Sequence, residues 1–253
     1  MEEPFALIDR LRRAASLAAR AEEGERNAGD ALAQGLGRAQ LHEIHAFLQE
    51  EAASAAGFAI GCVLVASARP ILWLRTEAAE RQGGRLHGPG LIAMGLDPQD
   101  LVVVVVADDS ALLRAAADGA RCPGLGTVIA EGWGAMRGYD LTASRRLMLA
   151  AEASGVVMIL LRVGGQVAPS AAVTRWSVAS APSRALAADA PGAPAYDLDL
   201  LRRRGGPAGA RWRVEWNRDM QSFDPAPLSG ARLPLVADRT VADRPPAPVR
   251  GTR

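Results

Sequence analysis

The sequence contains no lysine: all 29 basic residues among its 253 are arginines. A Schiff-base lysine, a lysine general base and the lysine of a phosphate-binding loop are therefore excluded. Cysteine and histidine are also scarce, with two and three residues. We expect both cysteines, Cys62 and Cys122, to be reduced and buried. The string His42–His45 (HEIH) is one residue too short for the zinc motif HExxH, so no metal site is expected.

Strong charge and long apolar runs are missing as well. The formal net charge is +1, so any attraction to nucleic acid must come from a local basic patch. No apolar run approaches the ~20 residues of a membrane helix. The opening residues, MEEPFALIDRLRR, are acidic and then amphipathic, unlike a signal or transit peptide. These features predict a cytoplasmic protein without a membrane partner.

The alternation of apolar segments predicts an α/β fold with a mostly parallel central sheet. Helical segments separate the expected strands, which are Leu41–Ala46, Ile71–Arg75, Leu101–Ala107, Thr127–Glu131 and Val156–Arg162. The run Leu101–Ala107 (LVVVVVA) is typical of a parallel strand covered on both faces. Short Gly/Pro connections then predict an antiparallel extension with strands at Val173–Ala179, Tyr196–Arg202 and Arg211–Trp216.

Two terminal segments flank this domain. Residues 1–35 are predicted to form an N-terminal amphipathic helix and a linker, and residues 224–253 a flexible Pro/Arg-rich tail. The apolar stripe of the helix includes Phe5, Ile8 and Leu11, which makes it a candidate interface helix. The alternative is that this helix folds back on its own core.

Six strings within residues 36–223 resemble the ImuA family of bacterial damage-inducible mutagenesis proteins, which are relatives of RecA. They are Leu41–Ile44 (LHEI), Gly90–Pro98 (GLIAMGLDP), Asp140–Leu147 (DLTASRRL), Ala151–Val156 (AEASGV), Thr174–Val178 (TRWSV) and Leu200–Gly206 (LLRRRGG). The resemblance implies a RecA-like core and a role in SOS-induced, error-prone translesion DNA synthesis. It implies two partners, an ImuB-like relative of Y-family polymerases and an error-prone C-family DNA polymerase.

The phosphate loop of a RecA-like ATPase is missing. Such an enzyme needs GxxxxGK[ST] after the first strand, because backbone N–H groups and a lysine hold the phosphates. The chain has Ala46–Ser54 (AFLQEEAAS) there, and Glu50 and Glu51 place negative charge where phosphates would lie. We therefore expect no catalytic residue, cofactor or metal. Glu131, at the end of a Walker-B-type strand, is interpreted as a hydrogen-bonded structural residue.

Arginines are the remaining chemical resource. The resemblance places several of them near surfaces that contact DNA or a neighbouring subunit in RecA-like proteins, and Arg175 precedes Trp176, a pairing that can stack bases. Solvation alone is the alternative for each. The candidate contacts to single-stranded DNA or a partner are Arg145, Arg146, Arg175, Arg202, Arg203 and Arg204.

Three functions remain open at this point. The first is a non-catalytic RecA-like scaffold for translesion polymerases, with or without self-association into an oligomer. The second is an ATP-dependent RecA-like DNA-binding ATPase, which the missing lysine opposes. The third is a SulA-like inhibitor of cell division, supported only by an old label for the family.

Overall fold

The computed structural model describes residues 32, 36–206 and 208–226. They form one nine-stranded sheet in the order β3-β2-β4-β5-β1-β6-β7-β8-β9. The first six strands in this order are parallel, and β6 to β9 are antiparallel. The strands are β1 (Gln40–Ala46), β2 (Ile71–Thr76), β3 (Leu101–Val106), β4 (Thr127–Trp133), β5 (Val157–Val163), β6 (Thr174–Ser180), β7 (Ala195–Arg203), β8 (Arg211–Asn217) and β9 (Ser222–Pro225). The predicted fold class is confirmed.

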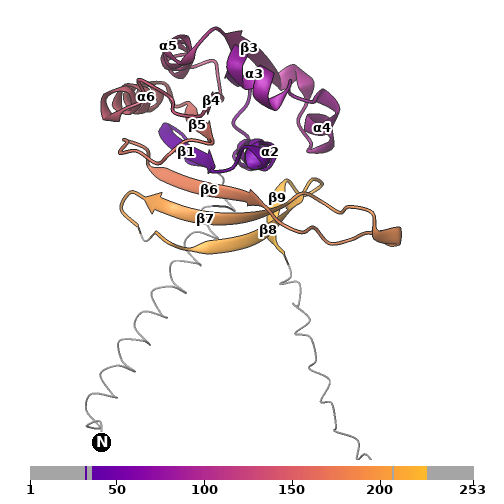
Figure 1. The fold of residues 1–253 in the computed structure, drawn as a ribbon. Helices are drawn as coiled ribbons and strands as arrows, with labels where there is room; N and C mark the ends of the chain where they lie inside the picture. The colour runs from indigo at the N-terminus through magenta and orange to yellow at the C-terminus, as the bar shows by residue number, and fades with distance from the viewer. Residues whose placement is uncertain (1–31, 33–35, 207, 227–253) are drawn as a thin grey trace, which may run out of the picture.

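Helix α2 (Ala52–Val65) lies in the concave side of the curved sheet, with β6 to β9 passing beneath it (Figure 1). Its sequence, AASAAGFAIGCVLV, is apolar all round, as expected for a helix enclosed on several sides. Phe58 packs against Trp176 of β6, with ring centroids 5.7 Å apart. A Cβ on Gly61 would lie 2.4 Å from the ring of Phe223 in β9, so only glycine lets the helix approach this closely.

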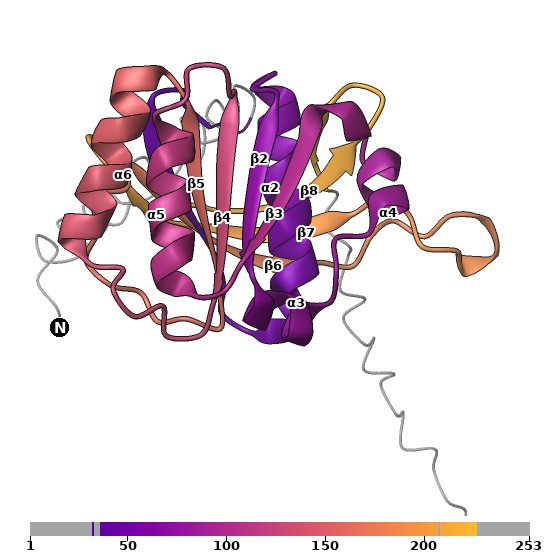
Figure 2. The same ribbon diagram turned by 90° about the horizontal axis from the view of Figure 1, so that it is seen from above.

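Helices α5 (Asp109–Ala120) and α6 (Leu141–Ser154) cover the opposite face of the parallel strands (Figure 2). Each begins with an aspartate N-cap, Asp108 or Asp140, whose side chain accepts a hydrogen bond from a backbone N–H three residues later. Leu112 and Leu147 are buried in the core beneath them. Two shorter helices, α3 (Glu77–Gly83) and α4 (Gly88–Ala93), follow β2.

Strand β3 differs from its prediction. It is parallel to β2, as expected, but it forms the edge of the sheet. Val102 to Val105 are 37–53% exposed, so neither face of the strand is covered. Helix α5 packs mainly on β2 and β4, and not on β3. The apolar run correctly predicted a β-strand. The prediction that both faces of this strand are buried was wrong.

Smaller differences concern neighbouring segments. Strand β6 pairs in parallel with β1, so the antiparallel part begins one strand later than expected. Strand β9 extends to Pro225, two residues into the predicted tail. Cys62 is buried as expected, but Cys122 is exposed. The predicted interface residues Phe5, Ile8 and Leu11 and the tail from residue 227 lie outside the described residues.

Candidate functional site

The connection from β1 to α2 occupies the place of a phosphate loop. It is short: β1 ends at Ala46, a 3₁₀ turn spans Gln49–Glu51, and α2 begins at Ala52. Glu51 is the N-cap of α2, and its carboxylate accepts hydrogen bonds from the backbone N–H and the hydroxyl of Ser180, at 2.6 and 3.2 Å. A helix N-terminus favours anions, and here the chain's own carboxylates supply the negative charge.

Glu131, near the end of β4, is saturated by internal donors. Both oxygens bind Arg75, with Nε–Oε2 at 2.8 Å and Nη2–Oε1 at 2.9 Å. The indole N–H groups of Trp73 and Trp133 donate to Oε2 and Oε1, at 3.0 and 2.7 Å. Arg75 and Glu131 are both 3% exposed. This geometry agrees with a structural glutamate, because a bound cation would have to displace four donors.

A cavity of about 590 Å³ lies beside this ion pair. The first turns of α2, the segment from Gly83 to Met94, and Trp133 form its walls. Its charged groups nearest the sheet, Arg75 and Glu131, already satisfy each other. The lining of the cavity is mostly apolar, and Arg85 and His87 are its other basic side chains.

A second buried charge cluster surrounds Glu43 of β1, on the face covered by α6. Its carboxylate accepts hydrogen bonds from Arg175 Nε and the Tyr139 hydroxyl, both at 2.5 Å, and His45 Nε2 lies 3.5 Å away. Burial opposes ionisation of Glu43, but hydrogen bonds from His45, Arg175, Ser170 and Tyr139 outweigh it and lower its pKa to about 2. Burial lowers the pKa of His45 and raises that of Tyr139.

This cluster fixes the two long connections beside α6. Tyr139 comes from the β4–α6 connection. Arg175 also donates to Ala168 O and Ser170 Oγ in the β5–β6 connection, at 2.7 and 2.9 Å. Arg162 holds the same connection through Gln166 O, at 3.0 Å, and its guanidinium carbon lies 5.7 Å from the Tyr139 ring centre. Both loops are therefore anchored from the protein interior.

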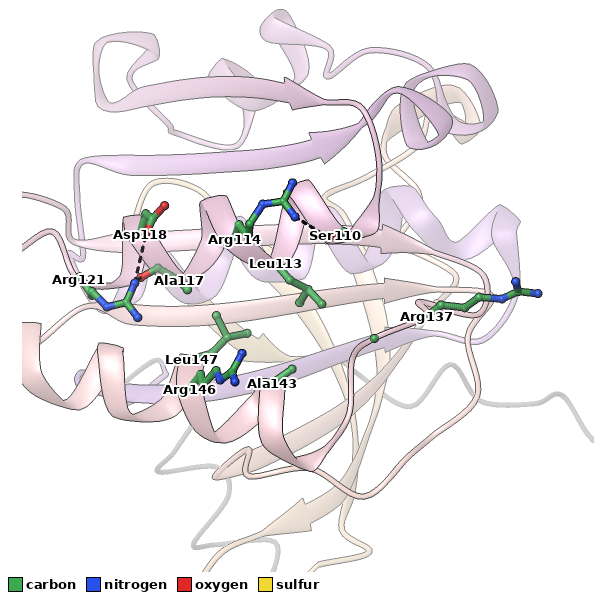
Figure 3. Close-up of a pocket in the computed structure, with 11 residues that line it drawn as sticks. Ser110, Leu113, Arg114, Ala117, Asp118, Arg121, Arg137, Ala143, Arg146 and Leu147 are labelled. Carbon is green, nitrogen blue, oxygen red and sulfur yellow. Dashed lines mark hydrogen bonds and ion pairs between the residues drawn. The ribbon is translucent and has the colours of Figure 1, made fainter.

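One groove on the surface lies between α5 and α6, with a volume of about 450 Å³ (Figure 3). Arg146 of α6 lines it, together with Arg114 of α5, Arg121 at the C-cap of α5 and Arg137 of the β4–α6 connection. Arg121 pairs with Asp118 at 3.0 Å, and Arg114 donates to Ser110 Oγ at 2.6 Å. The groove is basic, with an apolar floor that includes Leu113 and Leu147.

A second groove lies on the other side of α6, with a volume of about 390 Å³. It brings Arg145 of α6 together with Arg202 and Arg204, which are 57 and 59 residues further along the chain (202 − 145 and 204 − 145). We call it the α6–β7 groove; its lining residues are Leu141, Arg145, Met148, Leu149, Glu152, Ser170, Ala171, Arg202 and Arg204.

The six candidate arginines therefore separate into different environments. Arg146 faces one groove, and Arg145, Arg202 and Arg204 line the other. Arg203 is half-buried and has interactions of its own. Arg175 is only 7% exposed and is held by Glu43 and Ser170, so its burial does not support a contact to DNA or a partner. Trp176 is likewise buried in the core.

Sequence reasoning missed the two buried ion pairs. A signal was present in each case, since Arg75 and Arg175 stand alone in largely apolar strands, ILWLRT and TRWSVAS. A charged residue in such a strand is rarely buried unless it is paired. Which carboxylate forms the pair depends on the order of the strands in the sheet.

The described residues contain neither a cluster of metal ligands nor a membrane-spanning helix. No group of three or more His, Cys, Asp or Glu side chains among them could hold a metal ion. No helix in the described part of the chain is long and apolar enough to cross a membrane.

The chain is similar to known proteins in sequence and in fold. No protein-family model matches the chain. Protein ImuA from two strains of Caulobacter vibrioides is 32% identical over 168 residues, which span 62% of this chain and 65% of the relative, just under two thirds of its length. The crystal structure of the RadB recombinase superposes with a TM-score of 0.52 at 13% identity, covering 76% of this chain and 93% of that one. The latter shows the fold alone. The chain is therefore similar to ImuA proteins in sequence and RecA-like in fold.

Proposed function

We propose that the protein is a non-catalytic RecA-like accessory factor in SOS-induced, error-prone translesion DNA synthesis. In this role it binds an ImuB-like relative of Y-family polymerases and supports an error-prone C-family polymerase. Its similarity to ImuA proteins supports the involvement in mutagenesis. The absence of enzymatic activity is a separate part of the proposal and rests on the site itself.

The observation that carries this second part is the state of Glu131. A RecA-like ATPase needs a free carboxylate near the end of this strand and a lysine-containing phosphate loop. Here Arg75 and two indole N–H groups occupy both oxygens of Glu131. Glu51 stands at the N-terminus of α2, where phosphates would meet backbone N–H groups. Nucleotide binding is opposed at both places.

Surface features support a binding role. Helix α6 separates two basic grooves, each with an apolar floor, and hydrogen bonds from Arg175 and Arg162 anchor the β5–β6 connection beside it. A fixed surface of this kind suits recognition, because little conformational freedom is lost when a partner binds.

Thermal unfolding with and without Mg·ATP tests the proposed lack of nucleotide binding. A ligand at 100 times its dissociation constant adds about 2.7 kcal/mol of stability, which a melting curve resolves easily. We expect no shift with millimolar Mg·ATP and no phosphate release, alongside a RecA-type ATPase as positive control. An upward shift or measurable turnover would identify the protein as an ATPase and refute this part of the proposal.

Co-purification tests the partner part. The tagged protein, expressed with the ImuB-like protein of the same bacterium, should retain it through size-exclusion chromatography at 150 mM salt. Nuclease treatment separates a protein contact from a DNA bridge. If the two proteins elute separately under both conditions, the proposed partnership is wrong.

A further inference from the structure

The α6–β7 groove combines exposed apolar side chains with fixed positive charge. Leu141 and Leu149 are 42% and 64% exposed, although they belong to a helix that packs its other face well. Large aliphatic groups left in water beside a cavity are a common sign of a binding surface. The leucines lie eight residues apart, on one face of α6 and separated by about 12 Å along its axis.

Arginines form the rim above this apolar floor. Arg202 Nη1 donates to Ser170 O at 2.7 Å, and Arg204 Nη2 donates to Ala171 O at 2.8 Å. One nitrogen of each guanidinium is therefore held in place. Because the acceptors are neutral carbonyl oxygens, the positive charge of each arginine is not neutralised by them. Arg145 adds a third cation from α6, and Glu152 is the one acidic residue of the lining. The groove has a net charge of +2, from three arginines and one glutamate.

The composition favours a protein segment over nucleic acid. Single-stranded nucleic acid is usually held by aromatic side chains that stack on its bases. None of the described residues that line the groove is aromatic, so it offers no platform on which bases could stack. An apolar floor flanked by arginines instead matches a segment that carries both aliphatic side chains and carboxylates.

We propose that the α6–β7 groove is a docking site for an acidic, aliphatic segment of a partner protein. The aliphatic side chains of that segment cover Leu141 and Leu149, and its carboxylates pair with the rim of Arg145, Arg202 and Arg204. This inference concerns a surface that lies away from the nucleotide position. It therefore stands or falls independently of the proposed lack of ATP binding.

Fluorescence polarisation with a designed probe tests the proposal. The probe is a labelled 14-residue peptide of alternating Asp/Glu and Leu/Ile pairs, and the comparison peptide has Lys in place of every Asp and Glu. We expect the full-length protein to bind the acidic peptide at 150 mM salt at least tenfold more tightly than the basic one. Equal affinity for the two peptides, or no binding of the acidic one, would overturn the proposal.

Substitutions then locate the site. Arg145→Glu and Leu149→Ser each change an exposed side chain and should leave the melting temperature unchanged. Each should weaken binding of the acidic peptide about tenfold or more. Arg146→Glu is the matched control, because it makes the same charge change one residue along α6 but faces the other groove. Its affinity should stay within about twofold of the unmodified protein.

Two results would contradict this assignment. If Arg146→Glu weakened binding as much as Arg145→Glu, the peptide would be responding to overall charge. If labelled oligo-dT bound more tightly than the acidic peptide and lost affinity in Arg145→Glu, the groove would be a nucleic-acid site. In either case the α6–β7 groove would not be the proposed protein-docking site.

Discussion

Arg75 and Glu131 lie directly opposite each other on neighbouring parallel strands, joined by hydrogen bonds of 2.8 and 2.9 Å. The pair is nearly inaccessible to solvent. Two tryptophan N–H groups complete it, so donors from inside the fold engage both oxygens of Glu131.

Breaking this pair should destabilise the protein strongly. Arg75→Met leaves Glu131 buried without its cation, which costs about 3–5 kcal/mol. Arg75→Met combined with Glu131→Gln removes both charges and keeps one amide oxygen that can accept from an indole N–H, so part of the loss should be recovered. Urea denaturation measures both. Equal destabilisation by the single and double variants would show that charge pairing is not the cause.

Stability should fall on mild acidification because of a buried histidine. Burial lowers the pKa of His42 from 6.5 to about 4. Between these two pH values His42 is therefore protonated in the unfolded chain and neutral in the folded protein. The stabilisation is complete above pH 6.5 and is lost as the pH falls toward 4, by about 3 kcal/mol in total from His42. Burial lowers the pKa of His45 in the same direction.

Urea midpoints between pH 7.5 and 4.5 measure this dependence. His42→Gln should flatten it, because the titrating ring is gone. His87→Gln is the control, since His87 is exposed and the buried His42 and His45 remain. The explanation would be wrong if His42→Gln kept the full dependence. Glu43 contributes only at lower pH, because its lowered pKa of about 2 makes its loss run from about 4.5 downward.

The exposed edge strand should accept charge. Val102 in β3 is 53% exposed, and Val102→Lys should change the free energy of unfolding by less than about 1 kcal/mol while raising solubility. Val128→Lys in β4 is the contrasting variant. Val128 is fully buried, so that substitution should prevent stable folding. Thermal melts and light scattering compare the two. A large loss from Val102→Lys would mean that β3 is covered in solution.

Gly126, which packs against the backbone just before β2, should not tolerate a larger residue. A Cβ on Gly126 would lie 2.2 Å from the carbonyl carbon of Ala68, and backbone cannot move aside as a side chain can. Gly126→Ala should therefore destabilise the protein by about 1–3 kcal/mol or more. Gly124→Ala places its methyl group 3.8 Å from Cys122 Sγ and should be nearly neutral. Similar urea midpoints for the two variants would disprove this steric argument.

The sequence alone determined the fold class and the missing phosphate loop. Alternating strand and helix segments follow from local periodicity, which tertiary contacts did not override here. The absence of lysine and the residues Ala46–Ser54 are facts of composition, so no folding can restore a phosphate loop. The N-caps Asp108 and Asp140 also depend on local sequence alone, although they were not singled out from the sequence above, because capping involves only residues within one turn.

Strand order and burial were decided only by the tertiary structure. The run LVVVVV has the same local pattern whether the strand lies at the centre of the sheet or, as β3 does, at its edge. Arg175 and Arg202 are both arginines of strands, yet one is buried against Glu43 and the other lines a surface groove. Arg145 and Arg204 come together only because α6 packs beside the end of β7. Periodicity describes which residues share a face, whereas the neighbours of that face depend on contacts between segments far apart in the chain.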